Sequence, residues 1–246
     1  MSSNDHHYKQ LLQNPGKTKF ASCGYDDRFD PFTLNKNKKI QRIYGNLFEN
    51  FLADIPCEKI LDLGCGTGIY FDQLNKYAGE IEALDSSKDM IQVAGEYCKK
   101  ANLKSIHPHI GSAEALDYQD GRFDTVMAFD LLHHVPCVDT VVKEVYRVLK
   151  PGGHFLVFEP NICNPLMFFA HAIPSEERLA LKRNRPAVLK ALLERKFESI
   201  RWEGICELIT LSSGLKKLIL DSYLSLNRLV NIQKIYPRQA WLGKKG

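Results

Sequence analysis

The stretch Leu61-Asp62-Leu63-Gly64-Cys65-Gly66-Thr67-Gly68 decides which fold the chain is expected to have. It completes a short apolar run that begins at Lys59, and residues 69–77 behind it have a helical pattern. A strand that turns at once into a helix needs glycines, because only they tolerate so tight a reversal of the backbone. The same glycines let a ligand approach the bare backbone. The segment therefore predicts half of a βαβ unit with a binding site at its turn.

Strands and helices alternate on both sides of this loop. Apolar runs predict strands at 80–85, 105–110, 123–129, 154–158, 199–206 and 239–243, and helical spacing predicts helices at 40–52, 86–97, 138–149 and 186–195. Such alternation calls for an α/β fold with a doubly wound, mostly parallel sheet, whose ligands lie outside the carboxyl ends of the strands. Functional residues are therefore expected after residues 63, 85, 110, 129 and 158.

Composition excludes several classes of protein. The 246 residues are 44% apolar and 25% charged, which is typical of a globular domain and not of a disordered chain. The formal net charge of +4 is too small for a nucleic-acid-type charge field, so no DNA partner is expected. Seven cysteines without a C-x-x-C pair indicate a reducing compartment. Because residues 2–19 lack an apolar signal and no apolar run reaches membrane-spanning length, we expect a cytoplasmic protein, with peripheral membrane contact left open.

The spacing of the glycines argues against two common nucleotide sites. A G-x-G-x-x-G dinucleotide loop would place its third glycine at position 69, which is Ile, and no phosphate loop ending in G-K-S/T is present. Asp85 ends the second predicted strand, where a carboxylate can accept hydrogen bonds from both ribose hydroxyls of an adenosyl group. The loop and this acidic residue together favour an adenosyl ligand over a turn that binds nothing.

Further motifs follow in a fixed order. The segments LDLGCGTG (61–68), ALDSSKDM (83–90), GSAEAL (111–116), FDTVMAFDLLHHV (123–135) and VYRVLKPGGHFLVFEPN (145–161) resemble the consecutive motifs of class I S-adenosylmethionine-dependent methyltransferases. The resemblance covers roughly residues 40–161. It implies a seven-stranded sheet with one antiparallel strand, methyltransferase activity, and S-adenosylmethionine as the cofactor.

The resemblance also implies which residues hold the methionine and ribose parts of this cofactor. Gly64, Cys65 and Gly66 would pass beneath the methionine part, and Asp62 would steer its amino group through the turn. Asp85 would accept the ribose hydroxyls.

The remaining implied cofactor residues lie toward the adenine. Ser86 and Met90 would lie beside ribose and adenine, and Ser112 and Ala113 match the positions that flank the adenine amino group. Phe129 matches the end of the fourth strand beneath the cofactor. A core-filling role suits Met90 at least as well, because methionine packs readily at buried helical positions.

His133 and His134 are the candidate catalytic residues. They follow the fourth strand, and a neutral histidine there can take a proton from a hydroxyl or amine during methyl transfer. The alternative, which the resemblance also implies, is that they only pack and hydrogen-bond, since the family often has such a histidine before Val135. Methyl transfer itself needs little acid–base help, because alignment of the reactants supplies much of the rate. Glu159 and Asn161, after the fifth strand, are alternative substrate-facing groups. The histidines of the chain form no coherent ligand set, so no metal is predicted.

The ends of the chain supply the variable parts. Residues 1–35 are expected to form a flexible N-terminal lid, in which Tyr25 resembles the lid aromatic of the family, and residues 36–246 the methyltransferase domain. Within that domain, residues 207–236 form an unusually apolar and helical insert. Together with the apolar residues 165–170, this insert is expected to be a lid, an apolar pocket or a membrane-facing patch.

We therefore expect a methyltransferase for a small, apolar or lipid-linked acceptor. One alternative is a protein or RNA methyltransferase that uses the basic segments 36–42 and 182–185. The other is a non-catalytic cofactor-binding protein whose insert 207–236 binds a partner. The oligomeric state has no signal in the sequence.

Overall fold

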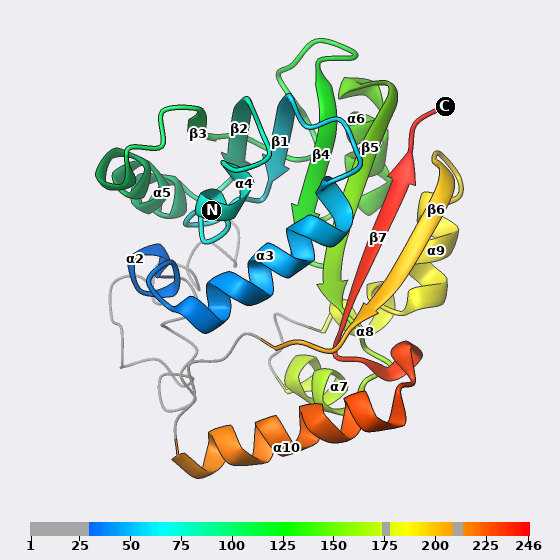
Figure 1. Ribbon diagram of the computed structural model, residues 1–246. Helices are drawn as coiled ribbons and strands as arrows, with labels where there is room; N and C mark the ends of the chain where they lie inside the picture. The colour runs from blue at the N-terminus through cyan, green and yellow to red at the C-terminus, as the bar shows by residue number, and fades with distance from the viewer. Residues whose placement is uncertain (1–29, 174–177, 209–213) are drawn as a thin grey trace.

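The computed structural model describes residues 30–173, 178–208 and 214–246. Their strands form one seven-stranded sheet in the order β3-β2-β1-β4-β5-β7-β6 (Figure 1). The strands are β1 (Lys59–Leu63), β2 (Glu80–Asp85), β3 (Ile106–Ile110), β4 (Phe123–Phe129), β5 (Leu149–Pro160), β6 (Glu198–Ile205) and β7 (Arg238–Lys244). Only β7 runs antiparallel to its neighbours. The predicted α/β fold with a doubly wound, mostly parallel seven-stranded sheet is confirmed.

Helices cover both faces of the sheet. They are α2 (Pro31–Leu34), α3 (Lys38–Leu52), α4 (Phe71–Leu74), α5 (Lys88–Ala101), α6 (Val138–Val148), α7 (Pro165–Ala172), α8 (Ala180–Arg183), α9 (Pro186–Leu193) and α10 (Gly214–Val230), followed by the 3-10 turn η4 (Gln233–Ile235). Helices α3, α4 and α5 pack on one face, and α6 and α9 on the other. Alternate residues of one strand serve the two cores, since Ile60 faces the first and Leu61 the second.

The helices begin where the sequence supplies a cap. The side chain of Ser87 accepts a hydrogen bond from Met90 N and begins α5, as the Ser86-Ser87 pair predicts. Asn37 caps α3 in the same way, through bonds from Lys39 N and Ile40 N. These local signals fix the helices that lie beside the first two strands.

Three predicted elements have wrong boundaries. The helix expected over residues 86–97 runs from Lys88 to Ala101. The helix expected over residues 69–77 is only the single turn α4, flanked by other turns. Strand β5 begins at Leu149 instead of 154, because residues 150–153 form an irregular part of the strand with Gly152 at φ +76°. Lys245 holds this irregularity, since its carbonyl accepts from Gly152 N and its N–H donates to Gly153 O. The residue that pairs with Gly152 and Gly153 is thus more than 90 positions further along the chain, where the local sequence gives no sign of it.

The variable segments lie near the carboxyl ends of the central strands. Helices α7 and α10 lie below the ends of β4 and β5 (Figure 1). Helix α10 and η4 fall inside the predicted insert 207–236. Within the predicted N-terminal segment 1–35, residues 31–34 form α2, whose Leu34 is fully buried, and residues 1–29 lie outside the described residues. No helix among the described residues has the length and apolar character needed to cross a bilayer.

Candidate active site

A cavity of about 1480 Å³ lies at the carboxyl ends of the parallel strands. The loops after β1, β2, β3 and β4 all contribute to it, as expected for a sheet of this topology. Its walls are completed by α3, α7, α10 and the end of β6. Most of the predicted site residues line this one cavity: Gly64, Cys65, Gly66, Asp85, Ser86, Met90, Ser112, Ala113, Phe129, His133 and His134.

Two predicted residues do not line it. Asp62 is buried and is absent from the cavity surface, and Tyr25 lies outside the described residues.

The glycine loop has the backbone that only glycine adopts easily. Gly64 and Gly66 have φ values of +76° and +55°. Gly64 N and Cys65 N both donate to Leu84 O of β2, at 2.7 and 3.1 Å, which ties the loop to the neighbouring strand. A Cβ atom on Gly66 would meet nothing within 4 Å. Gly66 therefore leaves open space in the cavity, as a loop that cradles a ligand requires.

Asp85 is held at the edge of this loop. Its carboxylate accepts hydrogen bonds from Gly66 N at 3.0 Å and from Ser87 N at 2.8 Å. These two bonds orient the carboxylate at the cavity wall, between the glycine loop and the start of α5.

Asp62 is a buried carboxyl group with an unsatisfied oxygen. It is 2% exposed, and its Oδ2 has no hydrogen-bond partner among the described residues. Burial, and secondly the charge of Asp85, raise the pKa of Asp62 to about 7. Leaving such an oxygen unpaired costs free energy, and a cationic group would relieve that cost. The fit of an ammonium-bearing cofactor at this loop rests on this atom.

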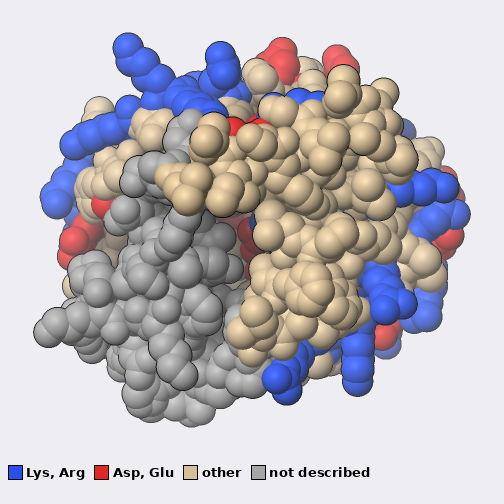
Figure 2. All heavy atoms as spheres, turned by 90° about the horizontal axis from the view of Figure 1, so that it is seen from below, with Lys and Arg blue, Asp and Glu red and all other residues tan. Residues whose placement is uncertain are grey.

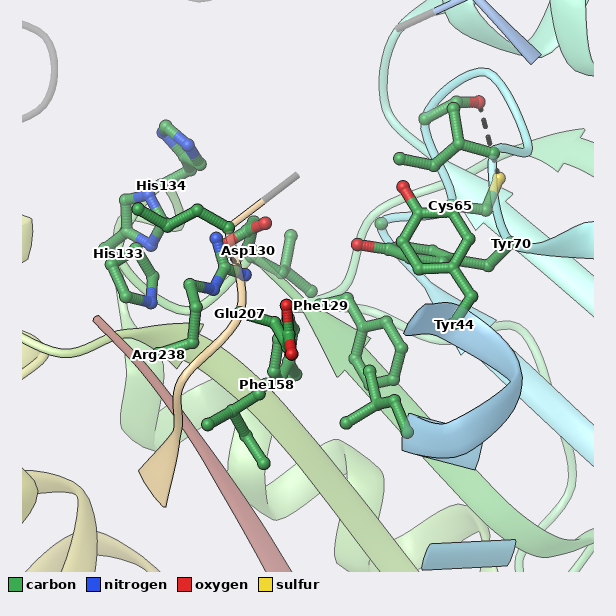
Figure 3. A pocket seen from close by; sticks show the side chains of 18 of the residues that line it. Tyr44, Cys65, Tyr70, Phe129, Asp130, His133, His134, Phe158, Glu207 and Arg238 are labelled. Atoms are coloured by element: carbon green, nitrogen blue, oxygen red, sulfur yellow. Dashed lines mark hydrogen bonds and ion pairs between the residues drawn. The ribbon is translucent and has the colours of Figure 1, made fainter. Parts of the chain in front are cut away.

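An aromatic cluster forms the floor between the two ends of the cavity. Phe129 lies 5.6 Å from Phe48, 5.0 Å from Tyr70 and 5.4 Å from Phe158 between ring centroids. Tyr70 and Tyr44 lie on one side of the cavity and the histidines on the other (Figure 3). Tyr70 directly precedes α4 and Tyr44 lies in α3. Neither was predicted as a site residue.

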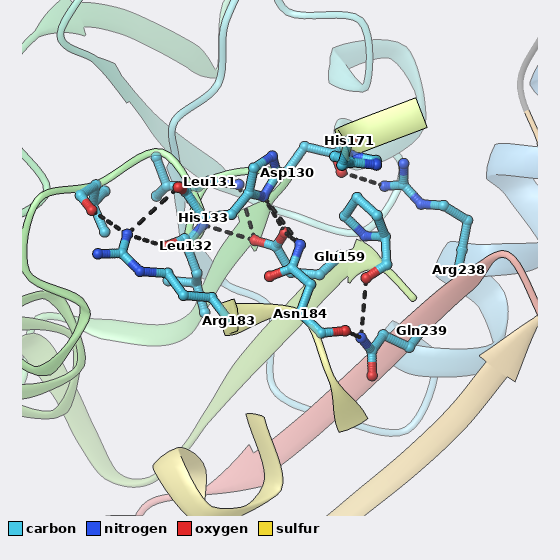
Figure 4. Close-up of polar contacts among 12 residues, drawn as sticks. Asp130, Leu131, Leu132, His133, Glu159, His171, Arg183, Asn184, Arg238 and Gln239 are labelled. Atoms are coloured by element: carbon cyan, nitrogen blue, oxygen red, sulfur yellow. Dashed lines mark hydrogen bonds and ion pairs between the residues drawn. The ribbon is translucent and has the colours of Figure 1, made fainter. Parts of the chain in front are cut away.

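His133 is fixed by Glu159. The two residues are 3% and 0% exposed, and His133 Nδ1 lies 2.6 Å from Glu159 Oε2 (Figure 4). Glu159 also accepts from Leu131 N, Leu132 N and Asn184 Nδ2, at 3.1, 2.7 and 2.8 Å. A carboxylate beside Nδ1 holds the ring proton on that nitrogen and makes Nε2 the basic nitrogen of the neutral ring.

The other histidine lies beside this pair. The ring of His134 is 4.0 Å from that of His133 between centroids, and His134 is half-buried on the cavity wall. Both histidines are thus placed where a reacting group in the cavity could meet them.

An ion pair forms the next part of the cavity wall. Arg238 donates to Asp130 Oδ1 at 2.6 Å and stacks over Phe158 at 4.3 Å. Burial works to raise the pKa of Asp130, but Arg238 outweighs it and holds that pKa below its usual value. Asp130 has a φ of +52°, so the chain turns sharply between β4 and the histidines. Arg183 holds the following loop by donating to the carbonyls of Leu132, Val135 and Pro136.

Two alternative substrate-facing residues are placed elsewhere. Glu159 and Asn161 do not line the cavity, so the expectation that they face a substrate is wrong. Glu159 lies beneath the histidines, and Asn161 donates to Lys234 O and accepts from Cys163 N. Asn184 and Arg238 were not predicted as site residues, because both come from segments without a motif and meet the site only in the folded chain.

The far wall of the cavity is mixed. It has apolar side chains, Met167 and Ala170 of α7, Leu224 of α10, Leu179 and Leu208, and beside them the polar side chains of His171, Glu207, Asp221, Ser225 and Arg228. In the described part of the chain, no group of three or more His, Cys, Asp or Glu side chains is placed to hold a metal ion.

Known proteins share this domain. A methyltransferase domain family matches residues 61–157. The ubiquinone biosynthesis O-methyltransferase of Methylococcus capsulatus is 36% identical over 145 residues, which are 58% of this chain and 60% of the relative. The demethylmenaquinone methyltransferase of Lactococcus lactis is 37% identical over 113 residues, or 45% of each chain. This chain thus spans less than two thirds of the curated relatives that it matches.

A solved structure shares the fold. Phosphoethanolamine N-methyltransferase 2 of Haemonchus contortus, in complex with S-adenosyl-L-methionine, has a TM-score of 0.67 and 17% identity, over 97% of this chain and 60% of that one. Residues 61–157 thus match a methyltransferase domain, and the whole described chain shares its fold with a solved methyltransferase structure.

Proposed function

We propose that this chain binds S-adenosylmethionine and transfers its methyl group to a small, apolar or lipid-linked acceptor. The observation that carries the proposal is the cavity, which joins the glycine loop and Asp85 to the histidine pair and to the apolar side chains of α7 and α10. A cofactor site and an acceptor site in one continuous space are what a direct transfer between two small molecules needs.

The residues at the loop end fit this cofactor. Asp62 places a buried carboxyl group behind the loop, where its charge can favour a nearby ammonium group, Gly66 leaves room beside the backbone, and Asp85 is held at the cavity wall. Ser112, Ala113 and Met90 line the adjoining part of the cavity, where adenine and ribose are proposed to lie. When bound, S-adenosylmethionine supplies an electrophilic methyl group on a sulfonium.

The other end of the cavity is proposed to align the acceptor. Alignment of two bound reactants can supply roughly 7–11 kcal/mol of barrier reduction, so exclusion of water and a fixed orientation are the main tasks of the wall. His133, with Nδ1 against Glu159, is proposed to take the acceptor's proton on Nε2. His134 beside it is the second candidate for this role.

The apolar side chains of the far wall support an acceptor with an apolar part. They come from α7, Leu179 and α10, away from the glycine loop. The names of two relatives concern ubiquinone biosynthesis and demethylmenaquinone, whose acceptors carry a ring and an apolar tail. We infer an acceptor of this general kind for this chain.

A paired-acceptor assay tests the proposal. Purified protein and methyl-labelled S-adenosylmethionine are incubated with a prenylated phenol or quinol and with the same ring without its tail. We expect labelled product with kcat/KM favouring the tailed acceptor, and no product with Gly66→Val. Equal use of both rings would refute the apolar acceptor, and absence of S-adenosylmethionine binding in calorimetry would refute the function itself.

A further inference from the structure

Helix α10 is apolar on its outer side as well as on its inner side. Leu224 is 5% exposed and lines the cavity, whereas Leu229 is 83% exposed. The exposed apolar side chains recur at helical spacing along the outer side: Leu215, Leu218, Ile219, Leu226, Leu229 and Val230. A helix whose inner side already serves the protein has no internal reason to keep leucines in water.

A second exposed segment belongs to the same surface. Leu166, Phe168, Phe169 and Ile173 of the α7 region are exposed, as are Leu179, Ile232 and Ile235. The α7 segment is tied to the end of the insert, because Asn161 donates to Lys234 O at 3.0 Å and Asn164 donates to Ile235 O at 2.7 Å. We call these exposed side chains of α7, Leu179, α10 and residues 232–235 the apolar face.

The apolar face surrounds one side of the cavity. Met167 and Ala170 of α7 and Leu224 and Arg228 of α10 line the cavity, while their neighbours in the same helices point outward. Seen from this side, a broad surface without acidic side chains adjoins a hollow, and Lys and Arg side chains lie at its margin (Figure 2). An exposed apolar patch at a cavity mouth with a basic margin is characteristic of a surface that meets a lipid interface.

Cations outnumber carboxylates near the apolar face. Arg178, Lys182 and Lys234 are exposed and lie within or beside its segments, whereas Arg228 pairs with Glu207 at 2.7 Å. Among the described residues of 161–173, 178–185 and 214–237, the only carboxylate is Asp221, and it pairs with Lys39 at 3.7 Å. Exposed cations beside apolar side chains complement anionic lipid headgroups.

We infer that the apolar face docks on an anionic phospholipid bilayer, with α10 lying along the interface and the cavity opening toward the lipid. This surface role goes beyond the proposed reaction, and it holds for whichever acceptor the cavity takes. A second copy of the chain is a poorer occupant, because two such faces in contact would bring like charges together.

Vesicle binding tests this inference without an acceptor. The full chain is sedimented with vesicles of phosphatidylcholine alone or of phosphatidylcholine with phosphatidylglycerol. We compare the wild type with Phe169→Glu and Leu229→Glu, neither of which lines the cavity. The matched control is Val188→Glu, an apolar residue of α9 that is 43% exposed and lies outside the apolar face.

We expect wild type and Val188→Glu to bind the anionic vesicles, with much weaker binding to phosphatidylcholine alone. Each variant of the apolar face should bind roughly tenfold or more weakly, a change that corresponds to about 1.4 kcal/mol. Unchanged thermal unfolding and S-adenosylmethionine binding would show that these variants are folded. Because vesicle binding needs no turnover, its failure and the failure of the proposed reaction are separate results.

Two outcomes would overturn the inference. Equal vesicle binding by wild type, Phe169→Glu and Leu229→Glu would show that the apolar face does not carry it. A dimer in analytical ultracentrifugation that the same two substitutions dissociate, without vesicle binding by the wild type, would assign the face to a second copy of the chain.

Discussion

Asp62 is the side chain on which pH should act most directly. Its pKa in the folded protein is raised from 3.8 to about 7, so the folded state binds more protons than the unfolded state between these values. The contribution of Asp62 to the free energy of unfolding is therefore full below about pH 4 and is lost as pH rises through about pH 7. Asp62→Asn should remove this loss. Thermal unfolding of the ligand-free proteins across this range checks it, and parallel curves for both proteins would contradict it.

The same carboxyl group makes a prediction about binding. If an ammonium group pairs with Asp62, S-adenosylmethionine should bind more tightly as pH rises through about 7 and ionises the side chain. Asp62→Asn should weaken binding and remove this pH dependence, because the amide cannot carry the negative charge. Calorimetry at several pH values measures both. Equal affinity of the two proteins at high pH would exclude the pairing.

Gly66 and Gly95 both have open space for a side chain, but only Gly66 lines the cavity. A Cβ atom on either residue meets no atom within 4 Å, but Gly66 has a φ of +55° and lines the cavity, whereas Gly95 lies within α5. Gly66→Val should abolish S-adenosylmethionine binding. Gly95→Ala should preserve binding and add roughly 0.5–1 kcal/mol of stability, because alanine loses less entropy in a helix. If Gly66→Val kept its affinity for S-adenosylmethionine, the ligand would not lie against the glycine loop.

Glu159 is predicted to act through His133. In Glu159→Gln the amide NH2 can face His133 Nδ1, which would then accept a hydrogen bond and place the ring proton on Nε2, the proposed basic nitrogen. We expect kcat to fall roughly 10²–10⁴-fold, the usual contribution of a general base. S-adenosylmethionine affinity should stay constant, and His109→Ala on β3 serves as the control. An unchanged kcat and pH profile would leave Glu159 as a loop anchor only.

At the scale of elements, Asn164 joins α7 to the insert. Its side chain accepts from Met167 N, which caps α7, and donates to Ile235 O, and the residue is fully buried. Asn37 caps α3 without such a tie. Asn37→Ala should cost about 1 kcal/mol, whereas Asn164→Ala should cost roughly 2–4 kcal/mol, because a buried carbonyl also loses its donor. Urea unfolding measures both losses in the free energy of unfolding. Equal losses would show that the hydrogen bond from Asn164 to Ile235 O contributes nothing.

The elements predicted correctly are those whose signals are local. The glycine loop, the Ser87 cap and the valine face of α6 lie within a few residues of the structure that they specify. The β5 boundary was missed because Lys245 holds it from the other end of the chain. For the same reason the motifs located the cavity but not Asn184 and Arg238, whose contacts with Glu159 and Asp130 arise only on folding.

At the scale of the whole molecule, the matched domain segment is not a complete core. Strand β7 pairs with β5 from His154 to Pro160, and Trp241 of β7 packs with Leu189 and Leu193 of α9 in the second core. A chain that stops after Asn161 would expose the edge of β5 and the apolar side of that core.

We therefore expect the chain ending at Asn161, which keeps the whole segment 61–157, to lack a cooperative unfolding transition and to bind no S-adenosylmethionine. The physical reason is that the late segments supply one of the two neighbours of β5 and the Arg238 partner of Asp130. Calorimetric melting and circular dichroism of the two chains compare them. A sharp transition in the shorter chain would mean that the first five strands and their helices fold alone, and that the late segments were added to a domain already stable.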